Sequence, residues 1–227
     1  MAEFFLELFS EEIPEKLQKN LREGLLDEFQ KFFLKNQIKS KKNFSFSTPN
    51  RLIIVFEGLD KELKTSSKEI KGPKIGAPDQ ALEGFVRSNK IEKKDLFEKK
   101  TEKGNFYFFK SKSKIFKTQD LLSENIPKLL DGHKWKKSMK WGEFDLRWGR
   151  LLKSILSVFD KKTINFSFHQ ITSCNSTFID SNLEDRKKTF TDFKSYQKYF
   201  KNQGVIVDQN KRKEFINKEF SKILNKK

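Results

Sequence analysis

The residues best suited to chemistry in this chain are aromatic and basic side chains within one short stretch, Met139–Leu152. It contains Trp141 and Trp148, and each tryptophan is followed directly by a glycine. The basic residues of the stretch include Lys140, Arg147 and Arg150. Arginine beside aromatic rings suits phosphate groups and stacked bases. Tryptophan is also highly buried on average, so the stretch predicts either a surface for a polyanion or a packed edge of a sheet.

No pattern for a self-contained catalytic site is found. The sequence has neither a GxxxxGK[ST] nor a GxGxxG phosphate loop, and its two distant histidines do not build a Ser/His/Asp arrangement. Those histidines and the single cysteine do not make a zinc site. The adjacent acids Glu11 and Glu12 could act in carboxylate chemistry, but we prefer to interpret them as partners of a helix dipole. A second cluster of acids is more simply a solvated turn than a metal site: Asp180, Glu184 and Asp185. We expect no catalytic residue and no metal site.

Composition points to a folded, basic protein. The 227 residues carry a formal charge of +17, are 35% hydrophobic and include 25 phenylalanines, enough to bury a core. The charge fits a nucleic-acid partner or a proteome rich in lysine, and the scattered lysines leave both explanations open. The single Cys174 excludes an internal disulfide and suits the cytoplasm. We expect no signal peptide, and no apolar run reaches the roughly 20 residues that span a bilayer.

The elements that must position these residues follow from hydrophobic spacing. A strand over 3–9 covered on both faces, a helix over 15–36, and a hairpin of strands 44–47 and 52–56 predict a β-α-β-β start. The fold class we expect is α+β, with antiparallel sheets, helices packed on one face and a helical end. We expect three regions: 1–60, 61–190 with the Trp-Gly stretch, and 191–227.

Further elements are expected along the rest of the chain. Up to residue 130 they are a strand near 68–71, a helix over 80–88 capped by Asp79, a hairpin that turns at Gly104-Asn105, and a helix from 118 or 120 towards 130 that is interrupted near Pro127. Strands 153–159 and 163–168 follow, paired around residues 160–162. The last elements are a helix over 193–201 stopped by Gly204, a strand over 205–207, and a helix capped by Asp208.

Four stretches, taken in order, resemble the β subunit of bacterial heterotetrameric glycine–tRNA ligase. Leu6–Pro14 is similar to its opening E-[IL]-x-x-E-E-[IL]-P, and Thr48–Leu52 to its T-P-R-R-L. Lys71–Pro73 with Ala81–Phe85 resembles K-G-P…A-x-x-G-[FW], and Met139–Leu152 resembles M-[RK]-W-G…[FW]-x-R-P. The sequence departs from the family at Leu151, where a proline is expected. It departs again at Asn175, Ser176 and Thr177, where Gly-His-Arg is expected.

The resemblance implies a role without chemistry of its own. In that family the α subunit carries the active site that uses ATP and glycine, so this chain is expected to bind no cofactor. Its expected partners are the α subunit, in an assembly of two α and two β chains, and tRNA(Gly), with no membrane. The expected nucleic-acid contacts are Arg51, Lys71, Lys140, Trp141, Arg147, Trp148 and Arg150. The resemblance covers the chain but only about the first third of a β subunit.

Other functions stay open on the sequence. A stand-alone basic RNA-binding protein would need no α subunit. A structural interaction domain would keep its RNA affinity unchanged when Arg147 and Arg150 are reversed to glutamate. A truncated, non-functional remnant is the third alternative.

Overall fold

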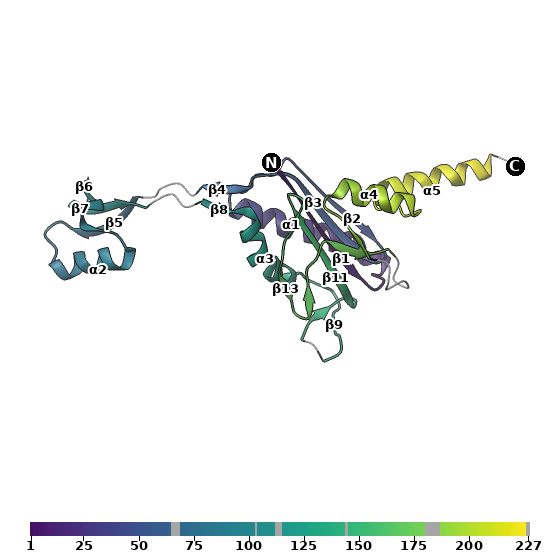
Figure 1. The fold of residues 1–227 in the computed structure, drawn as a ribbon, viewed down its shortest axis with the longest axis horizontal. Helices are drawn as coiled ribbons and strands as arrows, with labels where there is room; N and C mark the ends of the chain where they lie inside the picture. Colours follow the sequence, from purple (N-terminus) through teal and green to yellow (C-terminus); the bar gives the residue numbers. More distant parts are fainter. Residues whose placement is uncertain (65–68, 103, 112–114, 144, 180–186, 226–227) are drawn as a thin grey trace. The chain divides into compact units, whose positions relative to one another are not determined.

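The computed structural model describes residues 1–64, 69–102, 104–111, 115–143, 145–179 and 187–225 (Figure 1). Contacts divide the chain into two compact units: unit 1 is Met1–Lys61 with Lys117–Lys227, and unit 2 is Glu62–Phe116. Residues 117–190 therefore group with the N-terminal strands, whereas the sequence suggested one region over 61–190. The reason is long-range pairing, because β11 (Leu152–Phe159) pairs antiparallel along β1 (Ala2–Ser10).

Unit 1 is built on a five-stranded antiparallel sheet with β1 at its centre, in the order β12-β11-β1-β3-β2. After β1 come α1 (Glu15–Lys35), β2 (Lys42–Thr48) and β3 (Arg51–Leu59). The predicted β-α-β-β start is confirmed, and so is the hairpin, which turns at residues 49–50. The antiparallel α+β fold class is confirmed, but the helices, which we expected on one face, pack on both faces of this sheet.

Both faces of β1 are buried, as its mixed sequence predicts. Phe4 packs its ring against Phe29 of α1, with ring centroids 5.6 Å apart. Its neighbour Phe5 points to the opposite face and lies 4.9 Å from Tyr196 of α4 (Phe193–Asn202). The side chains of a strand alternate between faces, so α1 covers one face of the sheet and α4 the other.

The remaining elements of unit 1 correct several expectations. Helix α3 (Thr118–Gly132) runs through Pro127 without interruption. After β11 the chain turns at Asp160 and Lys161, both with positive φ, into β12 (Lys162–Thr163), so residues 163–168 do not form one strand. Residues 205–207 are not a strand. The other elements are β9 (Met139–Lys140), β10 (Arg147–Trp148), β13 (Ser167–Phe168), β14 (Ile171–Thr172), β15 (Ser176–Phe178), β16 (Lys187–Thr189) and α5 (Gln209–Leu224).

Helix caps explain where the last two helices begin. The Asp192 carboxylate accepts a hydrogen bond of 2.7 Å from the Ser195 backbone N–H at the start of α4. Asp208 accepts from the N–H groups of Asn210 and Lys211 at the start of α5, which confirms the predicted cap. Gly204, with a φ of +79°, follows α4 as expected.

Unit 2 contains a three-stranded antiparallel sheet in the order β5-β7-β6, with one helix after β5. The predicted hairpin is present, but Gly104 pairs with Thr101 and Asn105 with Lys100, so both lie inside β7 and not in the turn. Pro78, not Asp79, is the N-cap of the helix. The elements are β4 (Glu62–Lys64), β5 (Glu69–Lys74), α2 (Asp79–Asn89), the 3₁₀ turn η1 (Lys93–Asp95), β6 (Leu96–Thr101), β7 (Gly104–Lys110) and β8 (Ile115–Lys117).

Within the described residues, none of the helices has the length and apolar character needed to cross a bilayer.

Candidate nucleic-acid interface

The Trp-Gly stretch forms a short antiparallel pair, β9 with β10. Arg147 lies opposite Lys140, and both side chains are exposed. Lys140 Nζ lies 3.0 Å from the Asp145 carboxylate, and its hydrogen bond lowers the pKa of Asp145. Directly opposed residues of a strand pair have Cβ atoms about 5 Å apart, so this ladder brings two cations to one place on the surface.

The two tryptophans of the stretch have different surroundings. Trp148 is buried, and its ring centroid lies 4.9 Å from that of Trp135 and 5.7 Å from that of Phe168. Trp141 is half-buried, and its indole N–H donates to the Trp148 carbonyl at 3.2 Å. Trp148 therefore fits the interpretation of the stretch as a packed edge of a sheet, whereas part of the Trp141 ring remains accessible to solvent.

Trp135 was not identified from the sequence as part of this site, although it holds the stretch in place. A Cβ added at Gly149 would lie 1.9 Å from Trp135 Cε3, so only glycine allows this approach. The edge of His133 meets the Trp135 ring, and His133 Nδ1 lies 3.0 Å from a Glu28 carboxylate oxygen on α1. The only available signal was that a tryptophan and a histidine precede the stretch closely in sequence.

Three of the stretches that carry the family resemblance meet at one end of the unit 1 sheet. The N–H of Glu11 donates to the Leu151 carbonyl at 3.0 Å, and the N–H of Ile13 donates to the Pro49 carbonyl at 2.7 Å. The pairings Phe9 with Arg51 and Ser10 with Leu152 place the end of β1 beside the starts of β3 and β11. Leu151, where the family has proline, thus contributes its carbonyl to this junction.

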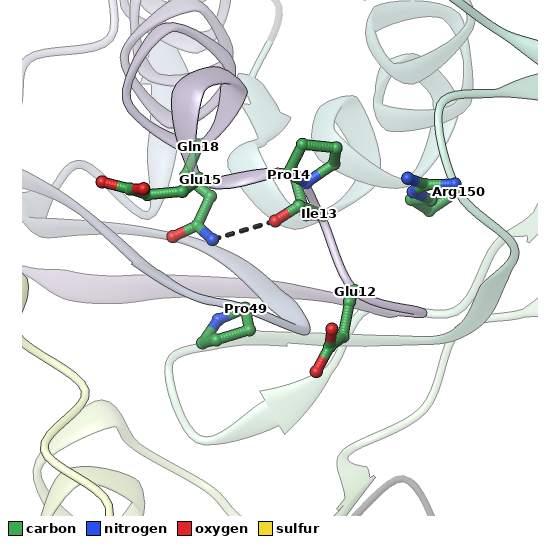
Figure 2. Close-up of a pocket in the computed structure, with 7 residues that line it drawn as sticks. All are labelled: Glu12, Ile13, Pro14, Glu15, Gln18, Pro49 and Arg150. Carbon is green, nitrogen blue, oxygen red and sulfur yellow. Dashed lines mark hydrogen bonds between the residues drawn. The ribbon is translucent and has the colours of Figure 1, made fainter.

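A hollow of about 450 Å³ lies at this junction (Figure 2). Gln18 closes one side by donating to the Ile13 carbonyl at 2.9 Å. Arg150 enters from the loop before β11, and among the described residues its buried Nε has no hydrogen-bond partner. The lining residues are Glu12, Ile13, Pro14, Glu15, Gln18, Pro49 and Arg150. The hollow is thus lined by a guanidinium group whose buried Nε lacks a partner and by two exposed carboxylates.

Arg51 lies inside unit 1, where a phosphate group would not reach it. It is 4% exposed, and its Nη2 donates to the carbonyls of Phe178 at 2.5 Å and Ile179 at 3.2 Å. Its guanidinium carbon lies 4.6 Å from the Phe9 ring centroid and 4.7 Å from that of Phe200. The geometry gives Arg51 a structural role in joining β3 to β15 and α4.

A buried carboxylate accompanies Arg51. Glu7 is fully buried, with Oε1 3.7 Å from Arg51 Nε and accepting a hydrogen bond from the Thr177 hydroxyl. Burial raises the pKa of Glu7 above its ordinary 4.5, although Arg51 acts in the opposite direction. The pKa of Tyr196 is raised well above 10, mainly by burial and to a lesser extent by the negative charge of Glu7. Thr177, where the family pattern has arginine, therefore satisfies one oxygen of this carboxylate.

Lys71 belongs to unit 2, where it is exposed on β5. The structure brings together Lys140, Trp141, Arg147 and Trp148. It places Arg150 at the hollow and Arg51 inside unit 1. Of the acids considered from the sequence, Asp180, Glu184 and Asp185 lie outside the described residues. Among the residues that are described, no group of three or more His, Cys, Asp or Glu side chains is arranged to hold a metal ion.

A family model described as the glycyl-tRNA synthetase beta subunit matches residues 4–227. The glycine–tRNA ligase beta subunit of Rickettsia felis is 36% identical over 218 residues, which is 95% of this chain and 33% of the relative. Those of Rickettsia akari and Rickettsia conorii are 34% and 35% identical over 216 residues, again 95% of this chain and 32% of each relative. The chain thus spans about a third of the length of these curated relatives.

Proposed function

Because this chain belongs to the glycyl-tRNA synthetase β-subunit family, we propose that it acts as a non-catalytic β-subunit part of a glycine–tRNA ligase. In this role it contacts tRNA(Gly) and the catalytic α subunit in the cytoplasm, in an assembly of two α and two β chains. The α subunit binds ATP and glycine, and this chain contributes no catalytic residue. The match over residues 4–227 carries the proposal.

The ladder of β9 and β10 is the surface that we propose for the tRNA backbone. Arg147 and Lys140 stand opposite each other and are exposed, which suits a phosphate between them. Trp141 offers part of a ring beside them, since its N–H is already bonded to the Trp148 carbonyl. Trp148 is buried and supports this surface from within, whereas the buried Arg51, which joins β3 to β15 and α4, is not part of it.

The junction at the end of the sheet supports the same role. Arg150 retains a buried donor without a partner in the described part of the chain, and it lines the hollow formed by the family-like stretches. We propose that this guanidinium receives an acceptor from tRNA or from the α subunit. The acids Glu12 and Glu15 on the same hollow disfavour a second phosphate close by.

Two measurements test the proposal. Co-expression with a glycine–tRNA ligase α subunit is expected to give a stable complex on size exclusion, whereas a stand-alone RNA-binding protein would elute without it. Binding of tRNA(Gly) is expected to weaken steeply with salt, because each phosphate contact releases counterions. The double reversal Lys140→Glu and Arg147→Glu should weaken binding, while the control Lys31→Glu on α1 should not. Unchanged affinity in the double variant would remove this surface from the proposal.

A further inference from the structure

One side of the unit 2 sheet carries aromatic rings and lysines together. On the central strand β7, Phe108 lies opposite Lys71 on one neighbour and Phe97 on the other. Directly opposed residues share a face, and every second residue along a strand returns to it. We call this side the aromatic–lysine face; it consists of Lys71, Lys74, Phe97, Lys99, Phe106 and Phe108.

The helix of unit 2 packs on the opposite side of the sheet. Phe85 of α2 meets Phe109 of β7 edge-on, with ring centroids 5.7 Å apart. A Cβ added at Gly72 would lie 2.6 Å from the Phe85 ring, so this glycine allows α2 to approach the sheet. This contact gives Gly72 and Phe85 a packing role, and it places α2 on the side away from the aromatic–lysine face.

Side chains on the aromatic–lysine face touch one another across the three strands. Lys71 Nζ lies 3.5 Å from the Phe106 ring centroid, and Lys99 Nζ lies 5.7 Å from that of Phe108. Phe97 and Phe108 lie 6.2 Å apart with an interplanar angle of 28°. Lys99 also pairs with Glu69 at 2.5 Å. Phe97, on the edge strand β6, is 36% exposed, whereas Phe108, on the central strand, is 8% exposed.

We propose that the aromatic–lysine face binds unpaired nucleotides of an RNA. Bases stack on Phe97 and on Phe106, whose ring becomes free when the Lys71 ammonium, 3.5 Å from its centroid, turns to a phosphate. The other phosphates contact Lys74 and Lys99, and such rings and cations together are what single-stranded RNA sites on sheets use. The exposed pair of Lys99 with Glu69 opens at little cost, because such pairs contribute little to stability. The inference rests on the proposed function, in which the bound RNA is tRNA and its unpaired bases reach this face.

The test uses the full chain and fluorescence anisotropy. The probe is a labelled uridine oligonucleotide of about 12 nucleotides, within the site sizes of sheet-based folds, and an RNA duplex of equal length serves for comparison. Phe97→Leu and Phe106→Leu keep an apolar side chain but remove the flat ring. Each is expected to weaken oligonucleotide binding roughly 5- to 150-fold, the loss of one stacked base, with duplex binding unchanged. The matched control is Phe116→Leu, at a phenylalanine that is 47% exposed on β8.

Lys71→Gln and Lys99→Gln extend the test to two exposed lysines of the same face. Each is expected to reduce the salt dependence of oligonucleotide binding by about one phosphate contact. Wild-type affinity in both leucine variants, or an equal loss in the Phe116→Leu control, overturns the inference. Equal competition by an acidic peptide of the same charge also overturns it, because a peptide needs no stacked base.

The two proposals fail in distinguishable ways. If tRNA and the oligonucleotide both fail to bind the wild-type chain, the tRNA role of the proposed function fails and this inference fails with it. If tRNA binding depends on Lys140 and Arg147 while the two leucine variants bind the oligonucleotide normally, only the inference fails.

Discussion

Replacing Gly149 with alanine tests the central packing contact of the Trp-Gly stretch. The added methyl carbon would lie 1.9 Å from Trp135 Cε3 and 2.3 Å from Cζ3, far inside van der Waals contact. Trp135 cannot simply move aside, because Trp148 and His133 pack against it. The backbone at Gly149 has no positive φ, so the predicted cost comes from the steric clash alone.

The magnitude follows from overpacking. Forcing one methyl group into a packed core costs about 1–3 kcal/mol, and 1 kcal/mol shifts the Tm of a domain of this size by about 2–4 °C. Gly149→Ala is therefore expected to lower the Tm by about 2–12 °C. The matched control is Gly132→Ala at the end of α3, where an added Cβ meets no atom within 4 Å. The control is expected to lose no stability.

Thermal unfolding followed by tryptophan fluorescence suits this comparison, because the chain has three tryptophans and all lie within residues 135–148. The Gly149→Ala variant should also bind tRNA more weakly, since the clash displaces the ladder that carries Arg147. A variant with wild-type Tm and an unchanged emission spectrum would refute the packing of Trp135 on Gly149.

Three further outcomes are expected. Asp192→Ala removes the cap of α4 and should lower the free energy of unfolding by about 0.5–2 kcal/mol in urea titrations; an unchanged midpoint would exclude the cap. Burial raises the pKa of Glu7 above 4.5, so the folded state binds the Glu7 proton more tightly than the unfolded state does. The wild type should therefore lose stability relative to Glu7→Gln as pH rises from about 4 through the folded pKa. A stability difference that does not change with pH would contradict the raised pKa. Lys140→Gln and Arg147→Gln should each reduce the slope of log affinity for tRNA against log salt by about 0.7–0.9, and an unchanged slope would exclude the corresponding phosphate contact.

Local patterns were enough to predict the elements that begin and frame the fold. Alternation along residues 3–9 predicted a strand covered on both faces, and β1 has Phe4 against α1 and Phe5 against α4. The acidic residue at 208 predicted a helix start that the capping hydrogen bonds confirm. Strand alternation and helix capping involve residues that are only a few positions apart, so they can be recognised from the sequence alone.

Misplaced boundaries came from competition between local rules and tertiary packing. Gly104-Asn105 is a favourable hairpin turn by residue type, but the pairing of Phe108 with Phe97 and Lys71 sets the register of β7 and draws both residues into the strand. Pro127 lacks an N–H, yet α3 continues through it, with Leu122, Ile126 and Leu130 fully buried. Their burial offsets the missing hydrogen bond.

The sequence by itself determined the family, the β-α-β-β start and the placement of basic residues beside Trp141 and Trp148. Only the tertiary structure decided which of these residues face solvent. Arg51 is buried because β3 pairs with β1 and the chain returns much later to place Phe178 and Phe200 against it. Trp148 is buried because Trp135 and Phe168 pack against its ring. Lys71, from the same family-like pattern, lies on an open sheet face because Gly72 admits Phe85 to the other side. Exposure depends on long-range pairing, and residue type alone does not specify it.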